Sequence, residues 1–140
     1  ETENIDRIID VAPEVVSHNL ETVRRLTREV RIQAKYDRSL EVLKYLKDNG
    51  ISRTKSGIML GLGENMEEVI ETLEDLIRVK VDIVTLGQYL QPSKKHLPVV
   101  DFVSPDEFKE YEIIAKDLGF RHVESGPLVR SSYKAHKHIH

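Results

Sequence analysis

The 140-residue sequence predicts an α/β fold in which parallel strands alternate with helices. The runs IMLGLG (58–63) and DIVTLG (82–87) are compact and almost continuously apolar, as in strands of a covered sheet or a barrel wall. Between them, apolar residues recur every three or four positions, which is the pattern of a helix of about four turns. Strand, helix and strand in this order form a βαβ unit with parallel strands and a right-handed crossover.

Further elements are expected before this unit. The sequence opens on Glu1, and the isoleucines of IDRIID (5–10) are spaced like the last turns of an amphipathic helix. We therefore expect the chain to be a piece of a larger protein. After Pro13, EVVSHN (14–19) predicts a strand, and a basic connector (22–35) follows it.

A first complete helix is predicted between Asp37 and Gly50. Asp37 is a suitable N-cap, and Gly50 supplies the left-handed residue that ends a helix. Leu40, Leu43 and Leu46 then form its buried face.

The second helix starts at a capping box formed by Asn65 and Glu68, since the glutamate three positions on can reach back to the cap. Its apolar face consists of Met66, Val69, Ile70, Leu73, Leu76 and Ile77.

A long loop (88–103) precedes the third helix, and loops of this length inside a domain are usually functional. Ser104 is the expected N-cap, Pro105 takes the first helical position and Glu107 completes a capping box. The buried face of this helix is Phe108, Tyr111, Ala115 and Leu118, and Gly119 ends it. After it, residues 120–136 read as a short strand, a Gly-Pro turn and an irregular tail.

Composition excludes several classes of function. The net charge is −3 and well mixed, which argues against a large basic face for nucleic acid. No apolar run approaches the ~18–20 residues that span a bilayer. The sequence has no cysteine, so these residues hold no disulfide, thiol nucleophile or Cys-ligated metal. We expect the histidine-rich end HKHIH (136–140) to be a solvated tail rather than a metal site.

Polar residues follow three of the predicted strands, at the edge where ligands of α/β proteins bind. They are His18-Asn19, then Gly61 to Glu64, then Gln88-Tyr89. Each has a structural alternative: the Gly-x-Gly can be a tight turn, His18 a hydrogen-bonded structural imidazole, and Glu64 a residue that favours a helix N-terminus. Three polar strand ends together favour a site at this edge.

Two clusters lie outside the strand ends. One is the run Arg130, Ser131, Ser132 and Tyr133, a candidate for an anion site or for an oxygen ligand to a metal. The alternative is a plain polar loop. The other is Lys94-Lys95-His96, a candidate contact for phosphate or an acidic partner, with a solvated turn as the alternative.

Five stretches, in register over nearly the whole chain from about residue 11, give the sequence its resemblance to the lipoyl synthases, a family of radical S-adenosylmethionine (SAM) enzymes. They are SHNLETV (17–23), TKSGIMLGLGE (54–64), TLGQYLQPSKKHLPV (85–99), VSPDEF (103–108) and SGPLVRSSYKA (125–135).

The resemblance implies a fold and an activity. The fold is the C-terminal part of a partial (β/α) TIM-like barrel (1–103), with a helical and tail extension that carries the RSSY motif (104–140). The parent enzyme holds two 4Fe–4S clusters and binds SAM, which it cleaves to a 5′-deoxyadenosyl radical. The radical removes hydrogen from C6 and C8 of an octanoyl chain on a carrier lysine, and sulfur from the auxiliary cluster is inserted there.

The missing cysteines put activity of this chain alone in doubt. The clusters of the family are held by two cysteine motifs in the N-terminal half, and this sequence has none. The chain therefore resembles the C-terminal half of the family and should be inactive by itself.

Residue roles follow the matched motifs. In RSSY a serine oxygen ligates the auxiliary cluster, which assigns Ser132, with Ser131 as the alternative. A hard oxygen on iron exchanges more easily than a thiolate, which suits a cluster that is to be dismantled. Arg130 beside it is a candidate on the substrate side.

The SAM-binding pattern Gly-x-Ile-x-Gly-x-x-Glu of the fifth barrel strand matches Gly57, Gly61 and Glu64. Met59 replaces the usual isoleucine and, as a flexible apolar side chain, should keep the adenine contact. At the end of the preceding strand, Asn19 takes the position that often binds the ribose. Candidates on the substrate side are His18, Gln88 and Tyr89.

Partners are also implied. The loop 89–96, with its lysines, is a candidate surface for acidic octanoylated carrier domains, namely dehydrogenase E2 subunits and the glycine cleavage H protein. An electron donor is required as well, and the expected location is a bacterial cytoplasm or a mitochondrial matrix. Two alternatives stand beside this interpretation: a non-catalytic module that docks a carrier domain, and an unrelated barrel enzyme for phosphate-containing substrates, for which no Gly-rich phosphate loop is present.

Overall fold

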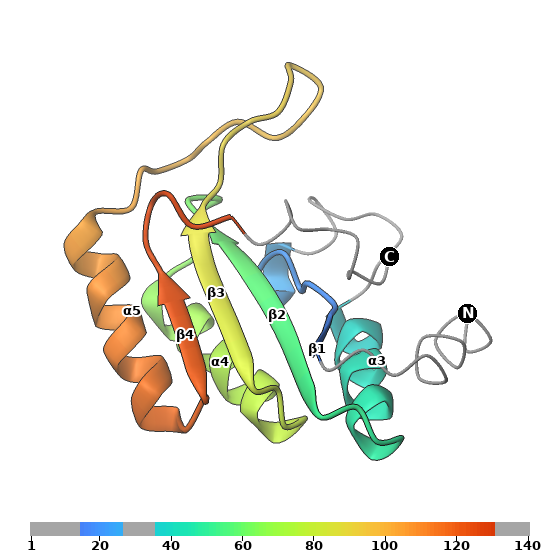
Figure 1. Cartoon of the computed structure of the whole chain (residues 1–140). Coiled ribbons are helices and arrows are strands. Elements are labelled where there is room, and N and C mark those ends of the chain that lie inside the picture. Colours follow the sequence, from blue (N-terminus) through green and yellow to red (C-terminus); the bar gives the residue numbers. More distant parts are fainter. Residues whose placement is uncertain (1–14, 27–35, 131–140) are drawn as a thin grey trace.

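The computed structural model describes residues 15–26 and 36–130, in which strands and helices alternate (Figure 1). The predicted N-terminal helix end (5–10) lies outside the described residues. In chain order the elements are β1 (Val15–Ser17), the short 3-10 helix η1 (Arg24–Leu26), α3 (Tyr36–Asp48), β2 (Arg53–Leu60), α4 (Met66–Arg78), β3 (Ile83–Gln88), α5 (Pro105–Leu118) and β4 (His122–Ser125).

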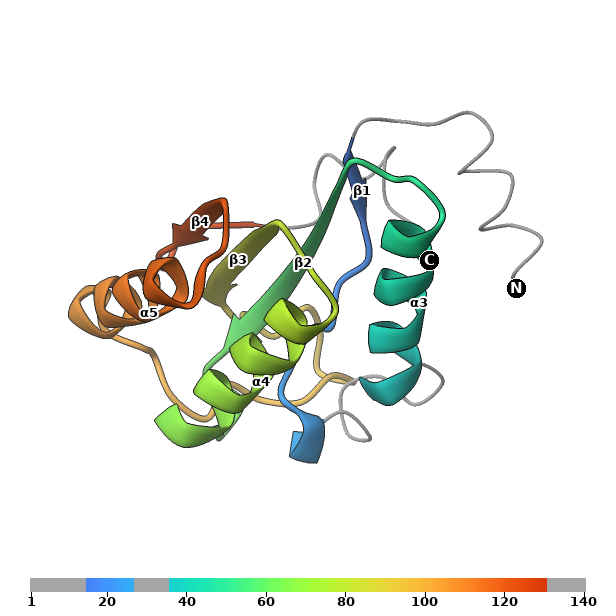
Figure 2. The same ribbon diagram turned by 90° about the horizontal axis from the view of Figure 1, so that it is seen from below.

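The four strands form one parallel sheet in the order β1-β2-β3-β4. The helices α3, α4 and α5 lie along one face of this sheet, as Figure 2 shows from below. Strands in sequence order, each joined to the next through a helix, build part of the wall of a (β/α) barrel. The predicted α/β class, the βαβ unit and the partial barrel are therefore confirmed.

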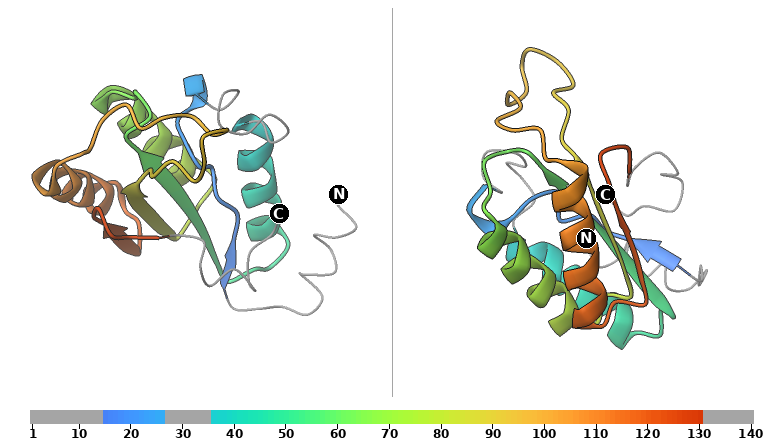
Figure 3. Two further views of the ribbon diagram at one scale, coloured as in Figure 1. Left: turned by 90° about the horizontal axis from the view of Figure 1, so that it is seen from above. Right: turned by 90° about the vertical axis from the view of Figure 1, so that its left-hand side faces the viewer.

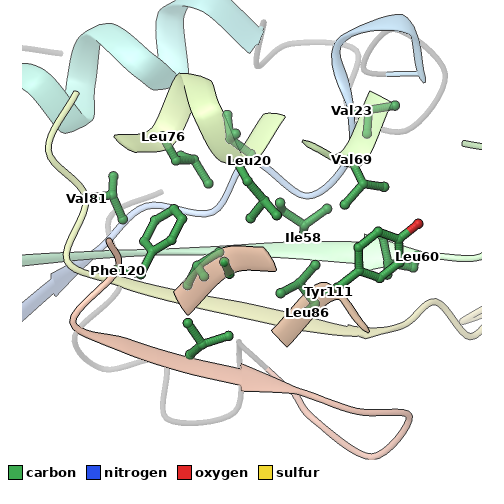
Figure 4. Packing of buried hydrophobic residues seen from close by; sticks show 14 of the residues in the cluster. Leu20, Val23, Ile58, Leu60, Val69, Leu76, Val81, Leu86, Tyr111 and Phe120 are labelled. Carbon is green, nitrogen blue, oxygen red and sulfur yellow. The ribbon is translucent and has the colours of Figure 1, made fainter. Parts of the chain in front are cut away.

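Side chains alternate between the two faces of each strand. Ile58, Leu60, Val84 and Leu86 point to the helices and pack in the main core with residues of α4 and α5 (Figure 4). The opposite face, which we call the inner face, carries the residues between them. Because parallel partners share a face, the register pairs Gly57 with Thr85 and Met59 with Gly87 on it. The inner face is formed by Gly57, Met59, Thr85 and Gly87 in β2 and β3.

Most helix ends follow the sequence prediction. The Asn65 side chain accepts a hydrogen bond from the Glu68 N–H (2.9 Å), and Glu68 accepts one from the Asn65 N–H (3.0 Å), which completes the capping box. Ser104 accepts from the Glu107 N–H (3.2 Å), one half of the second predicted box. Gly50 has a positive φ of 94°, as a helix stop requires.

Three local predictions are wrong in detail. Asp37 is not an N-cap: α3 begins at Tyr36, and Asp37 pairs instead with Arg24 at 2.6 Å. Strand β2 begins at Arg53, five residues before the apolar run. The run did not mark this start because the first half of the strand alternates more exposed and buried residues. Met66, predicted in the buried face of α4, is exposed at the first turn.

A buried carboxylate joins α4 to α3. Asp75, 4% exposed, accepts a hydrogen bond from the Tyr36 hydroxyl (2.6 Å) and pairs with Arg78 (2.7 Å). Burial of the phenol, followed by the bond to Asp75, raises the pKa of Tyr36 far above its ordinary value. The Tyr36 bond links the first residue of α3 to α4, whereas the Arg78 pair lies within α4. Within the described residues, no helix is long and apolar enough to cross a membrane.

Candidate functional site

The carboxyl ends of β1, β2 and β3 meet at one edge of the sheet, which Figure 3 shows from above. The residues predicted from sequence lie there: His18-Asn19 after β1, Gly61 to Glu64 after β2, and Gln88-Tyr89 at the end of β3. The grouping of polar strand ends is therefore present in the structure. Whether each residue contacts a ligand is a separate question.

The segment after β1 continues along β2. Glu21 forms a bridge with Ile58: its N–H donates to the Gly57 oxygen (2.9 Å), and its own oxygen accepts from the Met59 N–H (2.7 Å). His18 and Asn19 are buried just before this bridge, 8% and 7% exposed. The His18 Nε2 lies 3.2 Å from the Ser39 hydroxyl on α3. A structural imidazole is one of the two alternatives stated above, and this contact supports it.

Gly61 turns the chain after β2. Its φ is 102°, and a Cβ there would overlap the Asp101 carbonyl oxygen and the Gln88 side-chain nitrogen. The Glu64 carboxylate accepts hydrogen bonds from the N–H groups of Gly61 (2.9 Å) and Leu62 (3.0 Å). Glu64 therefore stabilises its own turn, and its proposed role toward SAM stays a prediction.

Gln88 fixes the loop that follows β3, which we call the 89–104 loop. Its Nε2 donates to the carbonyl oxygens of Tyr89 (2.9 Å) and Asp101 (3.0 Å), and its Oε1 accepts from the Val103 N–H (2.9 Å). The buried Tyr89 donates its hydroxyl to the Leu97 oxygen (2.7 Å), and burial raises its pKa. Both side chains bind the loop in this structure, so their placement on the substrate side stays a prediction.

The tip of the 89–104 loop presents cations. Ser93 Oγ lies 2.8 Å from His96 Nδ1 and accepts from the Lys95 N–H (3.2 Å), and Gln91 donates to the His96 oxygen (2.9 Å). Lys94 and Lys95 are exposed on this internally bonded turn. The loop projects beyond the edge of the sheet (Figure 1), with exposed apolar side chains at Leu90, Val100 and Phe102.

After β4 the chain turns back over the sheet. The Gly126 N–H donates to the Leu86 oxygen (3.1 Å), and the Val129 N–H donates to the Gly126 oxygen (3.1 Å). Arg130 Nη1 donates to the oxygens of Pro127 (3.1 Å) and Val129 (3.0 Å), so its guanidinium binds its own turn. Ser131 and Ser132, the predicted cluster ligands, lie outside the described residues.

Sequence analysis missed a groove of about 210 Å³ between η1 and α4. Arg25 crosses it: its Nε and Nη2 donate to the two Glu68 oxygens (2.8 and 2.9 Å), and Nη2 also donates to the Gly63 oxygen (2.9 Å). The two ends of this contact are 43 residues apart, so local patterns carry no signal for it. The groove is lined by Val23, Arg24, Arg25, Glu68, Glu71 and Thr72.

This ion pair predicts a pH dependence of stability. The Arg25 hydrogen bonds hold the pKa of Glu68 below its ordinary value of 4.5. A depressed carboxylate pKa stabilises the fold above the unfolded pKa, and this contribution is lost as the pH falls through the folded pKa. Glu68→Gln should therefore lower the free energy of unfolding by about 1 kcal/mol at pH 7. The deficit should shrink below pH 4.5.

Urea unfolding between pH 7 and pH 3.5 measures this difference. Glu67→Gln is the matched control, because Glu67 is exposed in the same first turn of α4 and shares any helix-dipole effect. A Glu68→Gln deficit that is equal at both pH values would contradict the prediction.

Within the described residues, no group of three or more His, Asp or Glu is placed to hold a metal ion, and the whole sequence lacks cysteine. The donors that iron–sulfur clusters require are therefore not supplied by the described part of this chain. On the inner face, Gly57 leaves β2 without a side chain, and Met59 two residues on is a half-buried apolar residue. Their role toward SAM stays a prediction.

Comparisons with known proteins show which family the sequence is similar to. The profile of the radical SAM superfamily matches residues 1–76. A lipoyl synthase of Christiangramia forsetii is 78% identical over 136 residues, 97% of this chain and 46% of that protein. A mitochondrial lipoyl synthase of Nematostella vectensis is 75% identical over 139 residues, 99% of this chain and 48% of that protein.

The similarity extends to more distant relatives. A lipoyl synthase of Porphyromonas gingivalis is 50% identical over 135 residues, 96% of this chain and 48% of that protein. The chain thus spans about half the length of the curated relatives it matches, and the match falls in their C-terminal half. The resemblance to lipoyl synthases is confirmed. The chain belongs to the radical SAM superfamily.

Proposed function

We propose that the chain is the C-terminal part of a lipoyl synthase. The complete enzyme inserts sulfur at C6 and C8 of an octanoyl group held on a carrier lysine, with S-adenosylmethionine as the source of the radical. The observation that carries the proposal is the 78% identity to a lipoyl synthase over 136 residues, 97% of the chain. We place the protein in a bacterial cytoplasm or a mitochondrial matrix, because such relatives are bacterial or mitochondrial.

The proposal divides the site between two halves of the protein. Cluster thiolates come from outside these 140 residues, which have no cysteine. This chain supplies the SAM side through Gly57, Met59 and Asn19 at neighbouring strands, and Gly61 and Glu64 shape the turn beside them. When both clusters are bound, they supply the electron for radical formation and the sulfur to be inserted.

A chimeric enzyme tests this division. The chain is joined to the N-terminal half of the Christiangramia forsetii lipoyl synthase, and lipoyl formation on an octanoylated carrier is followed by mass spectrometry. We expect activity in the chimera and none in either half alone. Activity in the separate chain, or a chimera that cleaves SAM without ever inserting sulfur, would contradict the proposal. Carrier binding by an inactive chimera would instead favour the docking module.

We further propose that the tip of the 89–104 loop binds the carrier domain. Lys94 and Lys95 are exposed on a turn that its own hydrogen bonds hold in place, at the same edge as the strand ends. Two cations on the same loop as the exposed apolar residues Leu90 and Phe102 suit an acidic protein surface with an apolar centre.

Charge reversal at this tip is expected to weaken carrier binding. In the complete enzyme, Lys94→Glu with Lys95→Glu should raise KM for the carrier about tenfold and leave kcat within about twofold, because the lysines steer binding and take no part in the reaction. The effect should fall as salt is added.

The matched control is Arg53→Glu with Lys109→Glu, which changes net charge equally at exposed positions on β2 and α5, outside the loop tip. An equal rise in KM with the control pair would show a non-specific charge effect and overturn the docking proposal.

A further inference from the structure

A glycine on β3 lies directly beneath the chain that returns after β4. A Cβ on Gly87 would overlap the carbonyl oxygen of Val129 and lie 3.2 Å from its carbonyl carbon. Both are backbone atoms, so no side-chain rotation relieves the contact. Gly87 is buried, and its φ is not in the left-handed region, so the strand itself does not require glycine here.

The returning segment is held on both sides of this contact. Gly126 donates to Leu86, the residue before Gly87, and the turn closes with the bond from the Val129 N–H to the Gly126 oxygen (3.1 Å). Arg130 Nη1 then donates to the Val129 oxygen (3.0 Å), the atom that faces Gly87. Figure 1 shows this segment crossing β3 near the carboxyl end of the strand.

From this arrangement we infer that Gly87 is a positioning residue, whose missing side chain lets residues 126–130 pack on the inner face. The register places Gly87 beside Met59, so Val129 lies next to a proposed SAM-binding residue of β2. Arg130 leads directly into Ser131 and Ser132, the proposed cluster ligands. A Cβ at Gly87 would force Val129 away from the strand, and Arg130, which is bonded to the Val129 oxygen, with it. The effect on catalysis rests on the proposed function, whereas the packing of residues 126–130 on Gly87 does not.

The test compares Gly87→Ala with Gly126→Ala in the complete enzyme. Gly126 is the matched control, because a Cβ there meets only the Val129 side chain at an ordinary 3.8 Å. Trypsin cleavage after the exposed Arg130, followed by mass spectrometry, reports the seating of the tail independently of activity. We expect cleavage about tenfold faster in Gly87→Ala, loss of most sulfur insertion, and SAM cleavage near the parent rate. Gly126→Ala should match the parent in all three.

A thermal unfolding cycle keeps the inference decidable if Gly87→Ala is poorly folded. Gly87→Ala should lower Tm in the complete enzyme and leave Tm unchanged in a version that ends at Gly126, where Val129 is absent. An equal fall in Tm in both versions, or trypsin cleavage at the parent rate, would contradict the packing of residues 126–130 on Gly87. A released tail with normal sulfur insertion overturns the positioning role. A parent enzyme that forms no lipoyl group would contradict the proposed function. Trypsin cleavage and the unfolding cycle would still test the packing of residues 126–130 on Gly87.

Discussion

Ser132→Ala in the complete enzyme is expected to lower sulfur insertion by about a hundredfold or more, while S-adenosylmethionine is still cleaved. Ligand loss should cost at least as much as the ~10–100-fold typical of outer-shell changes at metal sites. Radical formation depends on the other cluster of the proposed pair, so it should survive. The measurement is parallel mass spectrometry of 5′-deoxyadenosine and of the lipoylated carrier.

Ser131→Ala is the control for this variant, because it removes the same hydroxyl one residue earlier. It should be milder. The opposite ranking would move the ligand to Ser131, which is the stated alternative. Equal loss of both products in Ser132→Ala would count against any serine ligand in the RSSY motif, since it would indicate general damage rather than loss of the sulfur-donating step.

The fold was predictable from sequence where local patterns determine it. Asn65 and Glu68 are three residues apart and form their box within one turn, so the start of α4 could be read directly. The start of β2 could not. Arg53 is exposed and Lys55 half-buried, so the first half of the strand lacks the apolar run that marks the second half. Asp37 likewise matched a cap pattern but pairs with Arg24, 13 residues earlier, which no local pattern reveals.

The candidate site shows the same division. The polar ends of β1, β2 and β3 were predicted to share an edge because parallel strands run in one direction. The clamp from Gln88 to Asp101 and the contact of Gly87 with Val129 join residues 13 and more positions apart. For Gly87 a signal existed: an isolated glycine inside a β-branched strand often marks a close approach of another backbone. Burial of His18 and Asn19 behind the Glu21 bridge had no such signal.

The turn at Gly61 should be the position least tolerant of a side chain among the described glycines at this edge. Gly61→Ala is expected to lower the free energy of unfolding by about 3 kcal/mol, from backbone strain at a φ of 102° and from overlap with Asp101 and Gln88. The same overlap should break the bonds from the Val100 and Asp101 N–H groups to the Gly61 oxygen (2.8 and 3.2 Å). The 89–104 loop would then lose its anchor on the β2 turn.

Gly63→Ala separates the two causes, because it has nearly the same φ of 108° but meets only the Val100 side chain at 3.9 Å. It should cost about 1–2 kcal/mol through strain alone. Urea unfolding gives both energies, and hydrogen exchange of the 89–104 loop shows whether only Gly61→Ala releases it. If the two variants lose equal stability and protect the loop equally, backbone strain accounts for the whole effect, and Gly61 does not anchor the loop that carries Lys94 and Lys95.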